Sequence, residues 1–242
     1  DCMTNPTVDY VLGLHVTPLA EAGQILLKHG QITAASDSLM ITISGRSTHA
    51  AYPEEGIDAI VIAAQVITAM QTIVSRNISP LDAGVITLGR INGGARDNII
   101  AETVNLSGTI RSLDSKTRNT IKANLNRVVT GICEAMGGSC EITYTEGYLP
   151  IINHDQVMKV VASNAETLLG KPSVLIKEQP SLGVDDFSFF AHQAPAAFYY
   201  LGCGNQERGI TIPGHSPEFQ IDEECLKTGV ILQVMNALSL LK

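Results

Sequence analysis

The stretch from Ser36 to Tyr148 switches between two hydrophobic periods, and this pattern constrains the fold more than any other feature of the 242-residue chain. Ser38 to Ser44 alternates apolar and polar residues, as a strand with one buried face does. From Asp58 to Arg76 the apolar positions follow the helical period, with Asp58 as N-cap. Further elements are expected as strands at 84–91, 102–112 and 140–145, and as a helix at 115–136 capped by Ser115 and ended by Gly137-Gly138. The order β-α-β-β-α-β predicts a ferredoxin-like domain.

The segments on either side of this block predict parts of an α/β domain. Residues 8–16 are rich in strand-forming residues and end before Pro18, which indicates a buried strand. After the block, we expect helices at 156–169 and 188–193, a strand at 197–201 and a closing helix at 223–241. The chain is therefore expected to form two domains. Residues 1–35 and 149–242 form an incomplete three-layer α/β domain, and residues 36–148 form the inserted one.

Composition argues against several functional classes. The net charge of −8, without a cluster of Lys or Arg, argues against a nucleic-acid surface. The longest apolar run, Ala59 to Met70, is interrupted by polar residues and is too short to span a bilayer. Five scattered cysteines without a CxxC pair are typical of a reduced, cytoplasmic protein. Because the chain begins with Asp1 rather than Met, the sequence constrains localisation only weakly.

Three histidines occur in settings that present a side chain to a ligand. His49 follows a predicted strand, precedes a helix and has small neighbours, while His15 is expected at the end of a buried strand, where α/β sheets bind ligands. His215 lies between Pro213 and Pro217 in a loop that these prolines make rigid. Neutral imidazole is the commonest protein metal ligand. A lone histidine is nevertheless more often a core residue, and a catalytic metal site needs three or more ligands.

Other polar residues have both a structural and a functional interpretation. Asp185 and Asp186 either cap the helix that follows or supply carboxylates. Arg111, at the end of a predicted strand, either clamps a carboxylate or forms a surface ion pair. The glycines at 93–94 lack the spacing of a phosphate-binding loop and are interpreted as a connection that lets Asn98 approach a ligand.

Six motifs follow one another along nearly the whole chain: GLHVTP at 13–18, GRSTHAAYP at 45–53, QTIVSRNISPLDAGVITLGRINGG at 71–94, DNII at 97–100, GTIR at 108–111 and GHSPEF at 214–219. With these motifs in this order, the chain resembles the aminoacylase family of metallo-amidohydrolases. The branch that it resembles contains hippurate hydrolase, indoleacetyl-amino-acid hydrolase and N-acetyldiaminopimelate deacetylase.

The resemblance implies a metal-dependent amidohydrolase that cleaves N-acyl amino acids, or related small amides, to an amino acid and a carboxylic acid. It implies two divalent metal ions (zinc, manganese, nickel or cobalt) in the full enzyme, with His15 and His215 as ligands. The β-α-β-β-α-β block becomes a lid that pairs two subunits edge to edge in a homodimer. His49 then reaches a neighbouring subunit's site and stabilises the tetrahedral oxyanion, while Asn98 and Arg111 hold the substrate's amide and carboxylate.

The chain departs from the family pattern ahead of His15. The family's other ligands are a Cys-Gly-His-Asp segment and a Glu-Glu pair that carries the general base, and both are expected upstream of Gly13. Only 14 residues precede His15, and none of them is a glutamate or a histidine. Gly-Val-Asp-Asp-Phe at 183–187 also replaces the usual Gly-Ser-Glu-Asp-Phe. The sequence therefore predicts an N-terminally truncated chain that is inactive by itself.

A second hypothesis is a non-catalytic dimerisation or ligand-binding module, because the β-α-β-β-α-β order occurs in many binding domains. Such a module has no need of His15, His49 or His215. Replacing all three by alanine leaves a binding module unaffected, whereas an enzyme subunit loses metal or turnover.

Overall fold

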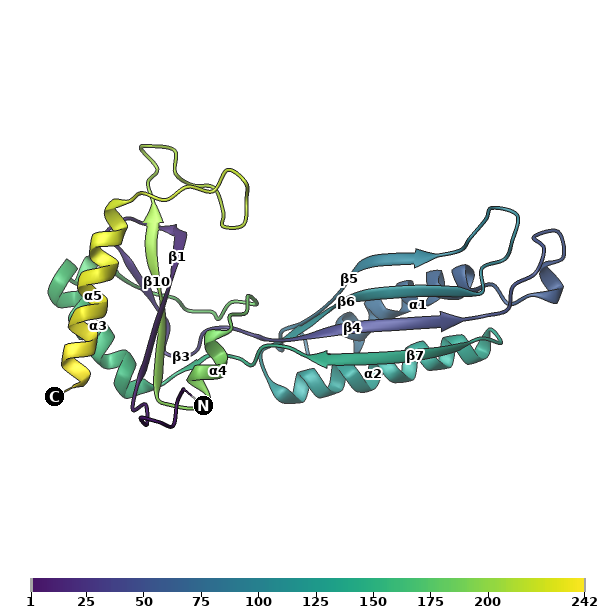
Figure 1. The fold of residues 1–242 in the computed structure, drawn as a ribbon, viewed down its shortest axis with the longest axis horizontal. Helices are drawn as coiled ribbons and strands as arrows, with labels where there is room; N and C mark the ends of the chain where they lie inside the picture. Colours follow the sequence, from purple (N-terminus) through teal and green to yellow (C-terminus); the bar gives the residue numbers. More distant parts are fainter. Residues whose placement is uncertain (1, 242) are drawn as a thin grey trace. The chain divides into compact units, whose positions relative to one another are not determined.

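Residues 2–241 are described here from a computed structural model (Figure 1). The chain divides into two compact units. The terminal unit comprises residues 1–33 and 149–242, and the inserted unit comprises residues 34–148. Each unit has a hydrophobic core of its own.

The inserted unit is one antiparallel sheet with two helices on one face (Figure 1). Its elements in chain order are β4 (Ala35–Ser44), the 3-10 turn Pro53–Glu55, α1 (Ala59–Thr72), β5 (Gly84–Gly93), β6 (Thr103–Ser112), α2 (Ser115–Ala135) and β7 (Ser139–Glu146). The strands lie in the order β5-β6-β4-β7. The element order β-α-β-β-α-β expected from the sequence is thus present.

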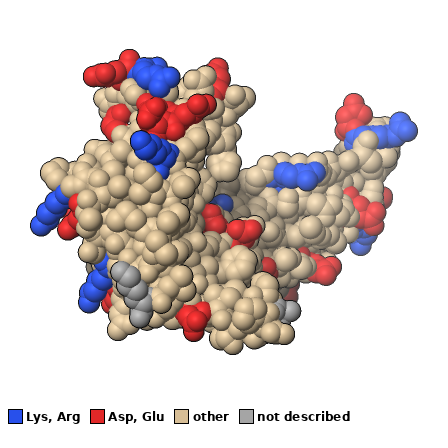
Figure 2. Space-filling view, turned by 60° about the vertical axis from the view of Figure 1, so that its left-hand side comes forward, with Lys and Arg blue, Asp and Glu red and all other residues tan. Residues whose placement is uncertain are grey.

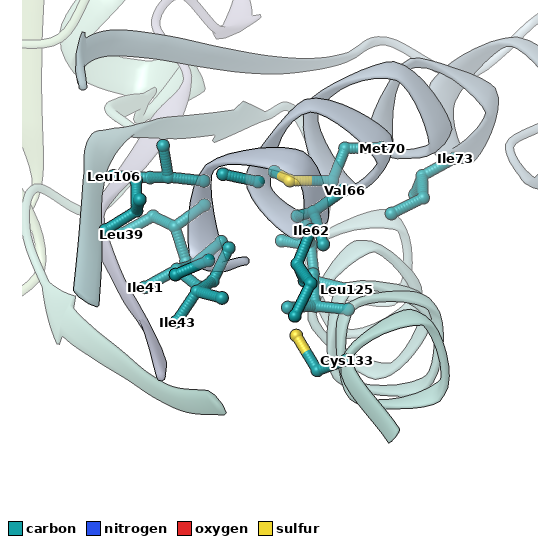
Figure 3. Close-up of a cluster of buried hydrophobic side chains, with 14 of the residues drawn as sticks. Leu39, Ile41, Ile43, Ile62, Val66, Met70, Ile73, Leu106, Leu125 and Cys133 are labelled. Atoms are coloured by element: carbon teal, nitrogen blue, oxygen red, sulfur yellow. The ribbon is translucent and has the colours of Figure 1, made fainter. Parts of the chain in front are cut away.

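Alternation along the central strands builds the core of this unit (Figure 3). Leu39, Ile41 and Ile43 are buried on one face of β4, because successive side chains of a strand point to opposite faces. Buried side chains of both helices, such as Val66 of α1 and Leu125 of α2, pack on that face. The other face of the sheet carries no helix of the inserted unit.

The helix boundaries confirm one predicted cap and correct another. The carboxylate of Asp58 accepts hydrogen bonds from the backbone N–H groups of Ile60 and Val61, so it caps α1 as expected. Ser115 is not the cap of α2: Asp114 is, and it accepts from the backbone N–H of Thr117 at 2.8 Å. A carboxylate one residue earlier competes successfully because it accepts the same bond with a full charge.

The first helix is longer than its apolar run suggested. A π-helical turn, Ile73–Asn77, continues α1, and together they form a helix of 19 residues. By length and composition alone this 19-residue helix is long and apolar enough to cross a membrane, whereas the apolar run from Ala59 to Met70 predicts a segment too short to do so. Ile62, Val66 and Met70 nevertheless lie in the core against the sheet.

The terminal unit is an α/β arrangement around a four-stranded sheet in the order β1-β10-β2-β9. Its elements are β1 (Val11–Glu21), β2 (Ile25–Leu27), β3 (Gly30–Gln31), β8 (Ile152–Asn153), α3 (Asp155–Leu169), the 3-10 turn Lys171–Ser173, β9 (Val174–Ile176), α4 (Phe187–Ala191), β10 (Ala196–Gly204) and α5 (Glu224–Leu240). Strands β1 and β10 are parallel, and β3 pairs separately with β8. Helices α3 and α5 share a core with one face of the sheet, whereas Phe187 of α4 packs against Phe198 on the other.

Strand β1 does not end at Pro18, as the sequence suggested, but continues to Glu21. Its register with β10 is irregular between Thr17 and Glu21. Such an irregularity accommodates a proline, which has no N–H to donate to the ladder. The strand therefore resumes beyond Pro18.

Candidate functional site

His15 lies inside strand β1 and not at its end, because β1 continues past Pro18. It faces Tyr200 of β10 in the parallel register, and the two rings meet edge to face with centroids 6.4 Å apart. Nδ1 of His15 is 2.7 Å from the backbone carbonyl oxygen of Val16. A carbonyl only accepts, so Nδ1 carries the proton and Nε2 keeps its lone pair. This is the tautomer that metal-binding histidines adopt.

Tyr200 and Asp185 join this part of the terminal unit. Burial raises the pKa of Tyr200, and the negative charge of Asp185 raises it further. Asp185 also accepts the backbone N–H of Phe187 at 2.9 Å, whereas Asp186 makes no side-chain capping bond. Tyr200 was not singled out from the sequence, since its position opposite His15 depends on the pairing of two strands far apart in the chain.

His215 lies in an exposed turn of the loop between β10 and α5. Its φ of 67° is the single positive value among the non-glycine residues that the structure describes. A non-glycine residue held in this region is a marker of functional or strained sites. Asp222 anchors the far end of the loop, because it accepts from Asn205 at 2.6 Å and pairs with Arg208 at 3.3 Å. The hydrogen bond from Asn205 lowers the pKa of Asp222, with a smaller contribution from Arg208.

The terminal unit offers metal-ligand chemistry without a complete metal site. The tautomer of His15 suits a ligand, and His215 is exposed on a loop. However, residues 2–241 contain no group of three His, Cys, Asp or Glu side chains able to hold a metal ion. A catalytic site of this kind needs at least three protein ligands. The described residues therefore do not by themselves hold the pair of metals that the sequence resemblance implied.

His49 lies in the inserted unit, in the segment between β4 and α1. It forms an isolated bridge with Ile99, and its ring is 5.9 Å from that of Tyr52. Nδ1 of His49 accepts the backbone N–H of Ala51 at 3.0 Å. In the neutral ring the proton then resides on Nε2, so His49 presents an exposed N–H donor. His15 and His49 thus offer opposite chemistry at Nε2: a lone pair and a proton.

The structure brings Asn98 close to His49 but separates Arg111 from both. The backbone carbonyl of Asn98 accepts the N–H of Ala50, the neighbour of His49, at 3.1 Å. Arg111 lies near the opposite end of β6, eight residues after Thr103, where the strand begins. At about 3.3 Å per residue those steps span about 26 Å. One inserted unit therefore does not bring its own His49 and Arg111 together.

Residues 35–136 match the M20 peptidase dimerisation domain. A protein of Synechocystis sp. named as a probable hydrolase is 39% identical, over 93% of this chain and 57% of its own length. Thermostable carboxypeptidase 2 of Saccharolobus solfataricus is 35% identical, over 96% of this chain and 58% of its own. The N-acetyl-L-cysteine deacetylase of Bacillus subtilis is 35% identical, over 90% of this chain and 51% of its own.

A solved structure, the YXEP protein of Bacillus subtilis, is described as a dinuclear metal-binding peptidase of the M20 family. It matches with a TM-score of 0.80 at 23% identity, over 98% of this chain and 59% of that one, which shows the shared fold. The chain spans a little more than half the length of the curated relatives above. These matches agree with the motif order read from the sequence, and the chain belongs to the M20 family of peptidases and amidohydrolases.

Proposed function

We propose that this chain is part of an M20 amidohydrolase that cleaves N-acyl amino acids to an amino acid and a carboxylic acid. Similarity to a deacetylase of N-acetyl-L-cysteine supports this class of substrate. In this proposal the inserted unit is a ferredoxin-like lid that pairs two subunits, and the terminal unit contributes to the catalytic domain. The five cysteines, none of them in a disulfide, fit a reduced cytoplasmic setting.

The observation that carries the proposal is the hydrogen bond that Nδ1 of His49 accepts from the backbone N–H of Ala51, which places the proton of the neutral ring on Nε2. Attack on an amide carbonyl places negative charge on its oxygen, and a fixed N–H donor that meets this oxygen stabilises the transition state. The bond from Ala51 N–H to Nδ1 fixes the required tautomer before substrate arrives. A histidine that served as a general base would need the opposite arrangement, with a lone pair at its exposed nitrogen.

Separation of His49 from Arg111 supports a shared site in a homodimer. Arg111 alternates with the buried Ile110, so its side chain projects from the face of the sheet that carries no helix. There its guanidinium suits the carboxylate of an amino-acid product. Because about 26 Å of strand lies between the two ends, we propose that His49 serves the substrate held by Arg111 of the second subunit.

The surface proposed for this pairing is the outer side of α1 together with the edge strand β5. The segment Ala59–Thr72 contains no charged residue, and Ile60 and Val61 are 50% and 48% exposed. Strand β5 pairs on one side only, with β6, among the described residues. An apolar helix face beside an open strand edge suits edge-to-edge pairing of two copies.

Metal dependence belongs to the proposal for the whole enzyme. His15 and His215 are the residues of this chain proposed as ligands, and the other ligands have to come from outside residues 2–241. When bound, divalent metals would supply Lewis-acid activation of the amide and of water. The part that this chain plays is then to orient the substrate through Arg111 and Asn98 and to donate a hydrogen bond to the oxyanion from Nε2 of His49.

The test uses a chimera in which this chain replaces the matching part of the Synechocystis relative. The metal-loaded chimera is expected to release free amino acid from a panel of N-acetyl amino acids. The single variants His49→Ala and Arg111→Ala of the chimera are each expected to be inactive when assayed alone. Random mixing of the two variants makes half of the dimers mixed, each with one complete site. Activity is then expected to return to about one quarter of the wild-type value.

The outcomes separate the alternatives. If mixing restores no activity, His49 and Arg111 do not meet across a dimer. If the chimera hydrolyses peptides but not N-acetyl amino acids, the carboxypeptidase relative is the better guide and the proposed substrate class is wrong. A folded, metal-loaded chimera that is inactive on both panels contradicts the amidohydrolase proposal and favours a non-catalytic module.

A further inference from the structure

A groove crosses the sheet of the inserted unit on the face that carries no helix of that unit, which we call the open face. It measures about 390 Å³ and is lined from all four strands. This volume is in the range of small-molecule sites. The lining includes the side chains of Ser38, Met40, Arg90, Ser107, Thr143 and Thr145. The groove therefore combines one cation with neutral hydroxyl donors and one flexible apolar side chain.

An irregularity in β5 directs Arg90 to the open face. The register of β5 with β6 shifts between Leu88 and Arg90, which makes Gly89 an extra residue. Arg90 therefore pairs with Ser107, which also lines the groove. Without the extra residue, Arg90 would pair with the buried Leu106 and point into the core. Bulges that redirect a side chain in this way are frequent next to functional sites.

No acidic residue pairs with Arg90 in the part of the chain that the structure describes. The ion pairs there are made by Arg118, Lys122 and Arg208. Among the described residues of the four strands, the open face carries one acidic side chain, that of Glu141 on β7, three strands away from β5. The Lys and Arg side chains in Figure 2 lie in small separate groups, without an extended basic patch on the surface shown. A single cation in such surroundings suits one carboxylate better than a polyanion.

Arg111 lies on the same face, and uncharged residues connect it to the groove. Ser107 and Arg111 both alternate with buried residues of β6, and the four residues between these two positions span about 13 Å of strand. Along this stretch the open face carries Thr109, with Thr87 of β5 and Ser38 of β4 as its partners on either side. Two arginines thus flank a short uncharged track on one face of the sheet.

We propose that the groove is a second subsite of the amidohydrolase, in which Arg90 binds an anionic group at the end of the substrate's amino-acid side chain. This inference rests on the proposed function, in which Arg111 holds the carboxylate of the same amino acid. The side chain branches from the carbon that carries this carboxylate, so it can follow the open face while the amide stays at His49 of the second subunit. Met40, which is 55% exposed, contacts the methylene groups of that side chain. The preferred substrates are N-acyl derivatives of dicarboxylic amino acids.

Two substrates that differ in one carboxylate test the inference. N-acetyl-L-2-aminoadipate and N-acetyl-L-norleucine have amino-acid chains of equal length, and the side chain of the first ends in a carboxylate. The chimera with the Synechocystis relative is expected to prefer the aminoadipate substrate in kcat/KM. Arg90→Gln is expected to lower this preference by about tenfold or more, mainly through KM, because a charge-assisted hydrogen bond is lost.

Two further variants of the chimera serve as controls. Arg90→Lys keeps the charge without the planar guanidinium and is expected to retain part of the preference. Arg127→Gln removes an exposed arginine of α2 and is expected to leave the preference unchanged. An equal preference in the unsubstituted chimera and in Arg90→Gln overturns the inference. A loss that appears instead between N-succinyl- and N-butyryl-L-norleucine also overturns it, because the second carboxylate would then belong to the acyl group.

Binding to this chain without turnover separates the subsite from the proposed activity. Two-dimensional NMR spectra of the isotope-labelled chain are recorded with rising concentrations of N-acetyl-L-2-aminoadipate. The amide signals of Arg90 and Ser107 are expected to shift, and to shift less with the norleucine compound or in Arg90→Gln. Equal shifts with both compounds, or no shift at these residues, overturn the subsite. An inactive chimera together with the expected shifts contradicts the proposed function but supports the groove as a carboxylate site.

Discussion

At the scale of single residues, hydrogen bonds to the backbone decide what each histidine offers. His15 donates from Nδ1 to the carbonyl of Val16, and His49 accepts at Nδ1 from the N–H of Ala51. The two imidazoles therefore differ in the proton at Nε2, although both follow small or apolar residues in the sequence. In each histidine, the backbone group that bonds Nδ1 thus decides which ring nitrogen carries the proton.

A prediction at this scale concerns the proton at His49. His49→Gln in the chimera keeps a side-chain N–H donor and is expected to retain more turnover than His49→Leu, with the loss mainly in kcat. Steady-state kinetics on an N-acetyl amino acid measures the difference. Equal kcat for the two variants would show that donation from this position does not matter.

Asp37 is the buried charge of the inserted unit. It is 2% exposed and bonds Arg118, at 2.7 Å from Nε, and Lys122, at 3.0 Å. Burial alone raises the pKa of Asp37, but the bonds and charges of Arg118 and Lys122 outweigh it and hold the pKa below its usual range. The carboxylate thus stabilises the fold at neutral pH.

Asp37→Asn is expected to lower the free energy of unfolding at pH 7 by about 2–4 kcal/mol, because two partly buried cations lose their counter-charge. Since the pKa is lowered in the folded state, the wild-type contribution is present above about pH 4 and is lost as the pH falls through the lowered value. Urea titrations at pH 7 and near pH 3 measure this. The difference in the free energy of unfolding between Asp37→Asn and the wild type should be smaller near pH 3 than at pH 7. An equal difference at both pH values would contradict the prediction.

At the scale of elements, two motif glycines are explained by close approaches of the backbone. A Cβ at Gly45 would lie 2.1 Å from the carbonyl oxygen of Ile57, and one at Gly108 would lie 1.9 Å from that of Thr87. Gly108 is in the GTIR motif, one strand away from the irregular register of β5 between Leu88 and Arg90. These glycines allow the close approach of neighbouring backbone segments.

Gly108→Ala is expected to destabilise the inserted unit by about 2–3 kcal/mol, because backbone of β5 has to move away from the new methyl group. The matched control is Gly89→Ala, which adds the same methyl group where nothing lies within 4 Å. Thermal unfolding of the two variants measures the contrast. Similar melting temperatures for Gly108→Ala and Gly89→Ala would show that β5 moves away from the new methyl group without loss of stability.

At the scale of the whole molecule, the chain builds two units around separate cores. The ends of the inserted unit lie side by side, since the N–H of Ser36 bonds the carbonyl of Tyr148 at 2.9 Å. Its sheet and both helices are formed entirely by residues 34–148. An inserted segment with adjacent ends and its own core meets the requirements of an independent domain.

Residues 34–148 expressed alone are therefore expected to fold and to unfold in one cooperative transition. If α1 and β5 form the subunit contact, sedimentation should give a dimer, and Ile60→Gln with Val61→Gln should give a folded monomer. Circular dichroism and analytical ultracentrifugation test both statements. A folded monomer in the unsubstituted segment would show that the subunits do not pair through this unit.

Elements with long periodic patterns could be predicted from the amino-acid sequence alone. The periods of β4, α1 and α2, the cap at Asp58 and the stop at Gly137, with a φ of 80°, were all readable locally. The motif order was enough to recognise the M20 family. Strands of two or three residues, such as β3 and β8, were missed because so short a segment has no measurable period.

The grouping of the candidate residues depends on the tertiary structure. It set Tyr200 opposite His15, fixed a different tautomer at His15 and at His49, and put Arg111 at the far end of the strand from His49. It also left Leu226, Val230, Val234 and Leu238 of α5 exposed, although they are as apolar as the buried Leu232. Periodicity depends on neighbours a few residues apart, whereas a site depends on strand pairing between segments separated by most of the chain.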